Sequence, residues 1–418
     1  MKRFGIVGIG GFAATILRSI LTVESEGVAH LEAAVVRHPA KYPDTVKRLE
    51  QEGRRLYLSL TEMLEKERGQ LDMVAIPTGI PYHAEMAVQA LEAGLDVIVE
   101  KPVAATVQEV DAIIAAERRT GHFCAVGYQH IHAPAMQTLR EEVENGRLGK
   151  IRRMKCFANW PRGRVYYDRN GWAGEVMYDG RWVLDGPVTN ALAHFLQNMF
   201  YLLGAETAWD VGITTLEGEL YRANDIATYD TVALRAHMTT GADVLITLSH
   251  VVGENENPII EIEAANATAR WMFDGVKSVI HYRDGTIRSV ETPGHVDFHA
   301  EAIRDAIAVA EGRRLRPRAT PTNSRLHVLA VDLAFESSEG IHEIPQRYRK
   351  AVTLPNGDRR VEVPGMEEAV RRSFAEFKLF SELGLPWAHA ARPVSGSGYV
   401  SFPQSPKLRA ELAKLSAR

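Results

Sequence analysis

The sequence predicts an α/β protein with two main domains: a parallel sheet in the first, then an α+β domain with a mostly antiparallel, open sheet. Three observations support this class. The 418 residues exceed what a single hydrophobic core usually organises. The first 128 residues alternate short apolar runs with helical patterns, which is typical of βαβ units. Residues 129–345 contain short strand-like runs separated by turn residues, which favours antiparallel pairing.

The expected elements of the first domain, residues 1–128, follow a regular order. An apolar run ends at a glycine-rich turn, and a helical pattern follows at Ala14–Leu21. Further strands are predicted at Leu31–Val36, Asp72–Ile76, Asp96–Val99 and Phe123–Val126, and helices at Tyr82–Ala93 and Val107–Arg119. Ligands bind beyond the carboxyl ends of parallel strands. We therefore expect the residues that follow these strands to form a binding site.

The glycine-rich turn has the pattern of a dinucleotide-binding loop. It reads Gly8-Ile9-Gly10-Gly11-Phe12-Ala13. Gly8 permits the tight turn, Gly10 lets the backbone approach a pyrophosphate, and Ala13 allows close packing of helix on strand. The helix N-terminus offers free N–H groups to the phosphates. The alternative is an ordinary strand–turn–helix that is rich in glycine. The pattern favours a Rossmann NAD(P)-binding domain.

The residues after the second strand favour the phosphorylated cofactor. An acid usually stands there to bind the ribose hydroxyls of NAD, whereas this chain has Arg37 and His38, with Lys41 nearby. A guanidinium suits a 2′-phosphate, so we expect NADP to be favoured. The expected cofactor contacts are Gly8, Gly10, Gly11, Phe12, Ala13, Arg37, His38, Pro77, Thr78, His83, Glu100, Lys101 and Gln129.

Several motifs resemble one family of enzymes. The triplet Glu100-Lys101-Pro102 follows a strand about ninety residues beyond the glycine turn, and residues 72–78, 81–83 and 92–97 match as well. Over residues 1–345 the chain resembles the glucose–fructose oxidoreductase / inositol dehydrogenase (Gfo/Idh/MocA) family. The resemblance implies a nicotinamide-dependent sugar or polyol oxidoreductase in which Lys101 lies between nicotinamide and substrate. It also implies a histidine of the second domain as acid or base.

Lys101 is therefore one candidate catalytic residue. A partly desolvated lysine beside the positively charged oxidised nicotinamide would lose its proton more readily than a free lysine. It could then bond to a substrate hydroxyl and shuttle its proton. The alternative is a lysine that pairs with Glu100 at the end of a strand.

The second domain is expected at residues 129–345, followed by an extension at 346–418 that the resemblance does not cover. Predicted strands are Ile151–Trp160, Thr231–Met238, Val244–Val251, Ile259–Ala265, Ala269–Phe273 and Ser278–Tyr282. Predicted helices are Leu139–Arg147, Phe298–Ala310 and Leu326–Glu339, and the extension contains one at Met366–Leu383.

A segment from Leu184 to His194 is predicted to start a helix that continues to Gly204. Asn190 and His194 are four residues apart, so we expect both on one helical face. The family usually has an aspartate at the first position and a histidine at the second. The resemblance thus implies His194 as acid or base, with Asn190 positioning the substrate. The alternative for His194 is a structural role between domains, and Asp185 is a candidate N-cap.

A loop rich in aromatic and hydrogen-bonding residues precedes this helix. Sugars offer C–H faces to aromatic rings and hydroxyls to planar donors. The candidate substrate-binding residues are Trp160, Arg162, Tyr167, Arg169, Asn170, Trp172 and Asn190. The alternative is a polar surface loop anchored by Trp172.

Composition narrows the possible partners. The net charge of −4 gives no basic footprint for nucleic acid, and no apolar run approaches the about 18 residues of a membrane span. The two cysteines, Cys124 and Cys156, lie in apolar contexts and are expected to be buried thiols without a disulfide or metal. We expect a cytoplasmic protein. The resemblance implies a homo-oligomer, a dimer or tetramer.

The sequence as a whole predicts transfer of a hydride between NAD(P) and a hydroxyl-bearing carbon of a sugar, polyol or related compound. Two alternatives stay open. One is a nicotinamide-dependent glycoside hydrolase or lyase that recycles its cofactor, which the replacement of the usual aspartate by Asn190 leaves possible. The other is a non-catalytic ligand-binding protein on the same fold.

Overall fold

A computed structural model describes residues 1–204 and 211–416. The chain forms two compact units: Met1–Ala104, Glu109–His132 and His295–Arg325 make up the first, and Ala105–Gln108, Ala133–Gly294 and Leu326–Arg418 the second. The helix predicted at Phe298–Ala310 therefore belongs to the first unit, although in sequence it lies within the segment expected to form the second domain.

The first unit contains a six-stranded parallel sheet, which confirms the predicted Rossmann-like domain. Its order is β3-β2-β1-β4-β5-β6. The strands are β1 (Lys2–Val7), β2 (Ala29–Val35), β3 (Arg55–Tyr57), β4 (Met73–Ile76), β5 (Asp96–Val99) and β6 (Cys124–Val126). Chain order reverses between β1 and β4, and the glycine-rich turn follows β1. The turn thus lies at the switch point, where ligands bind in doubly wound sheets.

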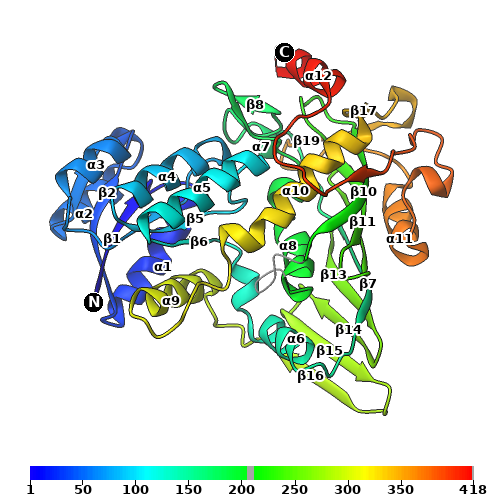
Figure 1. Ribbon diagram of the computed structural model, residues 1–418. Helices are drawn as coiled ribbons and strands as arrows, with labels where there is room; N and C mark the ends of the chain where they lie inside the picture. Colours follow the sequence, from blue (N-terminus) through cyan, green and yellow to red (C-terminus); the bar gives the residue numbers. More distant parts are fainter. Residues whose placement is uncertain (205–210, 417–418) are drawn as a thin grey trace. The chain divides into compact units, whose positions relative to one another are not determined.

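Helices α1 and α9 cover one face of this sheet (Figure 1). The helices of the first unit are α1 (Ala13–Ser25), α2 (Pro43–Gln51), α3 (Leu60–Lys66), α4 (His83–Glu92) and α9 (Phe298–Ala310), with 3₁₀ turns η1 (Pro39–Lys41), η2 (Ile80–Tyr82) and η3 (Gln129–His132). Helices α5 (Val107–Thr120) and α10 (Pro321–Ser338) each contain residues of both units. A core of apolar side chains, including Phe4, Ile20, Leu31 and Ile307, joins α1 and α9 to the sheet.

The second unit is built on a ten-stranded sheet that is mostly antiparallel, as predicted. Its order is β16-β15-β14-β13-β7-β12-β11-β10-β17, and β20 pairs with the edge of β10. Among the described strands of this sheet, the pairs β7·β12 and β10·β17 are parallel and the others are antiparallel. The strands are β7 (Ile151–Asn159), β10 (Ile213–Arg222), β11 (Thr231–Met238), β12 (Asp243–Ser249), β13 (Glu256–Ala264), β14 (Ala267–Met272), β15 (Lys277–Tyr282), β16 (Ile287–Glu291), β17 (His342–Glu343) and β20 (Val394–Ser395).

Helices lie on both sides of this sheet, with α8 and α11 on opposite faces (Figure 1). The remaining elements are α6 (Pro134–Glu144), α7 (Arg164–Tyr167), α8 (Ala193–Leu202), α11 (Met366–Glu376), α12 (Pro406–Ser416), η4 (Pro187–Ala191), η5 (Gln346–Tyr348) and η6 (Ser381–Leu383). Two short hairpins pair β8 (Met177–Tyr178) with β9 (Arg181–Trp182), and β18 (Lys350–Thr353) with β19 (Arg359–Glu362).

The C-terminal extension folds onto the large sheet. Buried Met366, Val370 and Phe380 join Tyr221 and Leu245 of the strands in one apolar cluster. The predicted helix Met366–Leu383 is wrong in its second half, because α11 ends at Glu376. Phe377 adopts a left-handed conformation with φ 56°, which terminates a helix. The extension is therefore part of the second unit's core.

We expect Met366→Ala to destabilise the protein by about 2–5 kcal/mol, because the side chain is almost fully buried and its loss leaves a cavity. Glu368→Ala, on the exposed side of the same helix, is the matched control and should change stability by less than about 0.5 kcal/mol. Thermal unfolding of both variants measures the difference. Equal stability of the two variants would show that the extension contributes little to folding.

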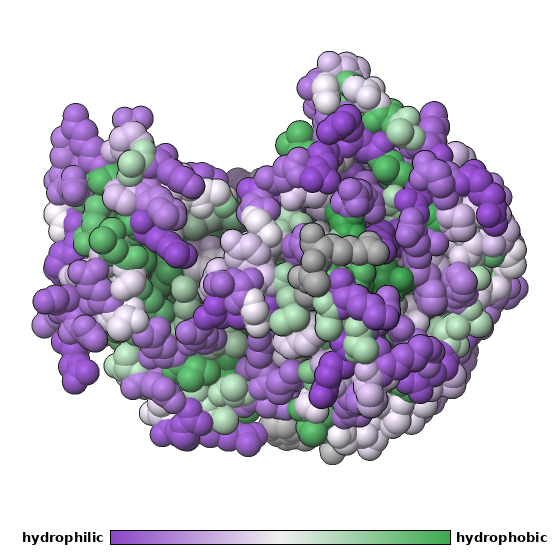
Figure 2. Space-filling model, turned by 90° about the horizontal axis from the view of Figure 1, so that it is seen from above, coloured by the Kyte–Doolittle hydropathy of each residue, from purple (hydrophilic) through white to green (hydrophobic). Residues whose placement is uncertain are grey.

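Both cysteines are buried and free, as predicted. Hydrophilic residues predominate over the face of the molecule shown in Figure 2. Within the described part of the chain, no helix combines the length and apolar character needed to cross a membrane.

Candidate cofactor and substrate sites

The glycine-rich turn has the backbone geometry that its sequence predicts. Gly8 and Gly11 have φ values of 101° and 58°, in the left-handed region that favours glycine. The amide of Gly8 donates to the carbonyl of Val35 at 2.9 Å, which fixes the turn against β2. Ala13 then begins α1. The turn thus leads directly into a helix N-terminus, as a phosphate-binding loop requires.

A tyrosine that sequence reasoning missed lies against this turn. A Cβ added at Gly10 would overlap the ring of Tyr42, so the two residues are in close contact. Tyr42 comes from the loop between β2 and α2 and is about one-third exposed. Arg37 and His38 are exposed in the same loop. A side chain at Gly10 would therefore displace Tyr42 as well as obstruct a bound phosphate.

A small cavity of about 10 Å³ lies beyond the carboxyl ends of β4, β5 and β6. It brings together the predicted residues Pro77, Glu100 and Gln129, and adds His299 from α9, which sequence reasoning missed. The Oε1 atom of Gln129 and the Nε2 atom of His299 are buried without a hydrogen-bond partner in the described structure. Buried polar groups normally have partners, so we expect a water molecule or a polar group of a ligand at these two atoms.

The Glu100 carboxyl lies beneath the candidate lysine. Its Oε2 accepts the backbone amide of Lys101 at 3.2 Å. Burial raises the pKa of Glu100 to about 7, and the positive charge of Lys101 partly opposes this. A Cβ added at Gly127 would lie 2.5 Å from Oε1 of Glu100, so a side chain at this position would displace the Glu100 carboxyl. The carboxyl group therefore titrates near neutrality directly beside Lys101.

His83 joins the loops that follow β4 and β5. Its Nδ1 lies 2.7 Å from the carbonyl of Pro102, and its Nε2 lies 3.1 Å from the carbonyl of Thr78. Burial lowers the pKa of His83, which favours the neutral ring, so one of its two nitrogens donates to one of these carbonyls. Thr78 has a buried hydroxyl without a partner in the described structure. His83 thus holds these loops in place, and the Thr78 hydroxyl is left for a ligand.

The helix expected from Leu184 to Gly204 is not continuous, so the prediction that Asn190 and His194 share one α-helical face is wrong. Residues Pro187–Ala191 form a π-helical turn, and Leu192, with φ −117°, separates it from α8. His194 lies in the first turn of α8 and is 6% exposed. The Nδ2 of Asn190 instead donates to Oδ1 of Asp185 at 2.9 Å. The break places the two side chains in different helical turns.

Asp185 is not a helix N-cap, contrary to the prediction. Gly186 precedes the π-helical turn and Leu192 precedes α8. The buried carboxylate of Asp185 accepts the amide of Gly174 at 2.7 Å and the side chain of Asn190. It also lies 3.8 Å from the guanidinium of Arg169. Asp185 therefore connects the aromatic loop to Asn190, a role that depends on contacts across the fold.

The aromatic loop forms a cluster of rings and guanidinium groups. The guanidinium carbon of Arg169 lies 3.8 Å from the ring centre of Tyr166 and 5.2 Å from that of Trp172. The guanidinium carbon of Arg162 lies 4.8 Å from the ring centre of Tyr166 and 5.4 Å from that of Trp160. The structure thus brings most of the predicted substrate residues together, and adds Tyr166.

Two predicted residues of this loop, Asn170 and Tyr167, differ from this cluster in what surrounds them. The Oδ1 of Asn170 accepts the amides of Trp172 and Ala173, so its oxygen stabilises the loop itself. Tyr167 is buried, and its hydroxyl has no hydrogen-bond partner in the described structure. Burial, together with the charge of Asp230, raises the pKa of Tyr167 well above its usual value. Tyr167 therefore stays protonated.

His250, directly after β12, also belongs to this cluster and was missed. Its Nδ1 lies 2.7 Å from the carbonyl of Trp160, and its ring centre is 6.1 Å from that of Tyr166. Its Nε2 is buried without a partner in the described structure. Burial lowers the pKa of His250 to about 3, and the positive charge of Arg162 adds to this effect. The predicted strand Val244–Val251 included His250, so no sequence signal marked it as a site residue.

Residues 2–128 match the model of the GFO_IDH_MocA oxidoreductase family, described as having an NAD-binding Rossmann fold. This first domain belongs to that family. The family resemblance seen in the sequence is therefore confirmed for this domain, and the predicted fold class is confirmed as well.

Curated relatives match part of the chain. D-glucoside 3-dehydrogenase of Escherichia coli is 31% identical over 32% of this chain and 36% of its own length. D-apiose dehydrogenase of Paraburkholderia graminis is 26% identical over 57% of this chain and 60% of its own length. The chain thus spans about a third to three-fifths of the length of these relatives.

Among solved structures, the WlbA dehydrogenase from Bordetella pertussis, in complex with NADH and UDP-GlcNAcA, is similar in fold. It has a TM-score of 0.66 and 21% identity, and the match covers 80% of this chain and 96% of that one. At this identity the match shows the fold alone. Because it covers 80% of this chain, the similarity in fold includes residues well beyond the first domain.

Proposed function

We propose that this protein transfers a hydride between NAD(P) and a hydroxyl-bearing carbon of a sugar or polyol. The observation that carries the proposal is the set of residues at the carboxyl edge of the first sheet. There the glycine-rich turn at the switch point and the Glu100-Lys101 pair after β5 belong to one NAD-binding domain. Relatives named as sugar dehydrogenases support the substrate class.

The residues of the first unit suit a nicotinamide dinucleotide. The turn offers amides and a helix N-terminus to phosphates, and Thr78 and Gln129 offer buried oxygens that lack partners in the described structure. The nicotinamide ring would supply the hydride acceptor or donor. The chain's own residues would hold the substrate and exchange its hydroxyl proton. We assign that exchange to Lys101 and His194, with Asn190 orienting the substrate.

The proposal is tested by a screen of sugars and polyols with NAD⁺ and NADP⁺. We expect formation of reduced cofactor that depends on both the carbohydrate and the enzyme. A screen in which no hydroxylated substrate reduces either cofactor, and no corresponding ketone oxidises the reduced cofactor, would remove the support for this activity.

We further propose that NADP is preferred over NAD. Arg37 and His38 follow β2 and are exposed, where a 2′-phosphate would approach. Replacing Arg37 with Ala should weaken NADPH binding by about 10- to 100-fold, as expected for loss of a hydrogen bond to a charged group, and leave NADH binding unchanged. Fluorescence titration with both cofactors measures this. Lys47→Ala, on exposed α2, removes the same charge and is the control.

Two outcomes of that titration would contradict the preference. The first is wild-type protein that binds NADH as tightly as NADPH. The second is an Arg37→Ala variant whose NADPH affinity equals that of Lys47→Ala.

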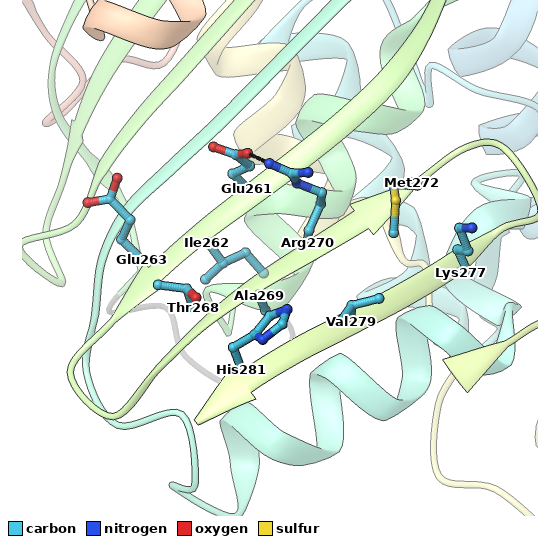
Figure 3. A pocket seen from close by; sticks show the side chains of 10 residues that line it. All are labelled: Glu261, Ile262, Glu263, Thr268, Ala269, Arg270, Met272, Lys277, Val279 and His281. Atoms are coloured by element: carbon cyan, nitrogen blue, oxygen red, sulfur yellow. Dashed lines mark hydrogen bonds and ion pairs between the residues drawn. The ribbon is translucent and has the colours of Figure 1, made fainter. Parts of the chain in front are cut away.

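We propose that the protein assembles as a homo-oligomer through the outward face of β13, β14 and β15. Figure 3 shows this recessed face, where Glu261 pairs with Arg270 and where Glu263 and Lys277 lie toward opposite ends. Charges of both signs on one surface suit a self-complementary contact. Light scattering of the purified protein tests the assembly, and a monomer would contradict it. The expected cytoplasmic location stays a prediction from sequence.

A further inference from the structure

We propose that the substrate is an acidic sugar or polyol, whose carboxylate or phosphate binds Arg162 while a neighbouring hydroxyl binds His250. The inference rests on the proposed function, because it names the class of substrate taken by the same site. It is carried by the polar groups that this cluster leaves unsatisfied.

The first observation is the charge of Arg162. Its guanidinium carbon lies 5.4 Å from the ring centre of Trp160 and 4.8 Å from that of Tyr166, and its Nη1 donates to the carbonyl of Pro161 at 3.3 Å. Its Nε is buried without a hydrogen-bond partner in the described structure. Within residues 1–204 and 211–416, no carboxylate forms an ion pair with it. The other two arginines of the loop differ, since Arg164 pairs with Asp168 at 2.8 Å and Arg169 lies 3.8 Å from Asp185.

A half-buried guanidinium without a counter-charge is costly, because burial removes water and the neutral carbonyl of Pro161 does not balance the positive charge. The nearby carboxylates do not compensate it. Asp185 is bound by Gly174 and Asn190, and Asp230 accepts the amides of Ala223 and Asn224. An anion brought by the ligand would supply the missing partner with a charge-assisted hydrogen bond.

The second observation is the pair of uncharged groups beside Arg162. Because Nδ1 of His250 faces the carbonyl of Trp160, that nitrogen carries the ring proton and Nε2 is left as an acceptor. Neither Nε2 nor the buried hydroxyl of Tyr167 has a partner in the described structure. A ligand hydroxyl can donate to His250, while Tyr167 can donate to a ligand oxygen.

These requirements together describe one kind of ligand. Arg162 can bind an anion, and His250 can accept a hydrogen bond from a hydroxyl group. The rings of Trp160 and Tyr166 can pack against an apolar face of the ligand. A neutral sugar would satisfy the last two and leave the guanidinium unpaired. An acidic sugar or polyol satisfies all three.

The test is calorimetric binding of matched acid and neutral pairs to the full-length protein. The pairs are glucuronate and glucose, galacturonate and galactose, gluconate and glucitol, and glucose 6-phosphate and glucose. We expect at least one acid to bind about tenfold or more tightly than its neutral partner, as loss of a charged hydrogen bond would predict. The carboxylate and phosphate arms show which anion the site prefers.

Arg162→Met should abolish this advantage, and Arg162→Lys should keep part of it. Arg164→Met is the matched control, because it removes a charge from the same loop that is already paired with Asp168. Unfolding temperatures of all variants confirm that they are folded. No acid with an advantage over its partner, or an advantage that survives in Arg162→Met, overturns the inference.

Turnover separates this inference from the proposed function. Reduction of NAD(P)⁺ by a neutral sugar, undiminished in Arg162→Met, would overturn the inference and leave the oxidoreductase proposal standing. Binding of an acid that depends on Arg162, without reduction of cofactor by any carbohydrate, would do the reverse.

Discussion

Replacing Lys101 with Met is expected to lower turnover by about 10²–10⁴-fold, the usual contribution of a general acid or base. The residue follows β5 at the edge of the sheet where the glycine-rich turn and the cavity lie. We assign it to the substrate hydroxyl rather than to the cofactor phosphates. Affinity for the dinucleotide and the unfolding temperature should therefore stay close to those of the wild type. Steady-state kinetics and cofactor titration measure these quantities.

Lys66→Met is the matched control for this variant, because Lys66 is exposed at the end of α3. It should behave as wild type in every measurement. A loss of less than about tenfold in Lys101→Met would assign the lysine a structural role. A parallel loss of cofactor affinity would place it on the cofactor instead of the substrate.

Replacing His194 with Ala is expected to have an effect of similar size, about 10²–10⁴-fold on turnover. Histidine has the side chain whose ordinary pKa is nearest neutrality, which suits reversible proton exchange. Asn190 has no titratable group and already donates to Asp185. Asn190→Ala should therefore lower turnover far less. Turnover measured against pH for both variants tests the assignment.

Asn190→Asp is the informative companion variant. A carboxylate at this position would favour a protonated imidazole at His194, so we expect retained activity with a pH optimum shifted upward. If His194→Ala keeps the wild-type pH profile, the proton path runs elsewhere, and Lys101 becomes the alternative, with Tyr167 as a hydrogen-bond donor. The role of the second unit's helix would then have to be revised.

The sequence predicted most strands and helices, because their apolar runs and turn residues are local signals. The helix Phe298–Ala310 was predicted at its observed bounds. Strand β3 escaped notice, since its three residues include an exposed arginine and carry no apolar pattern. The long helix predicted from Met366 failed at Phe377, where a left-handed backbone angle ended it. Helical periodicity does not report such an angle.

In the candidate site, too, local sequence signals predicted some residues correctly and missed or misplaced others. Pro77, Glu100 and Gln129 were predicted together, because the carboxyl ends of parallel strands meet at one edge. His299 and His250 were missed, since they reach their clusters through packing between segments that are remote in sequence. Asn190 was misplaced because a period of 3.6 residues cannot reveal a π-helical turn. Long-range contacts therefore decide the part of the site that sequence patterns leave open.

Hydride transfer itself is tested most directly with a substrate that carries deuterium at the reacting carbinol carbon. If the protein is an oxidoreductase, one deuterium should appear in the reduced nicotinamide for each substrate oxidised, as mass spectrometry of the isolated cofactor would show. A glycoside hydrolase with recycled cofactor would consume substrate without accumulating reduced cofactor. Substrate turnover with no net reduction of NAD(P)⁺ and no deuterium in the nicotinamide would contradict the account.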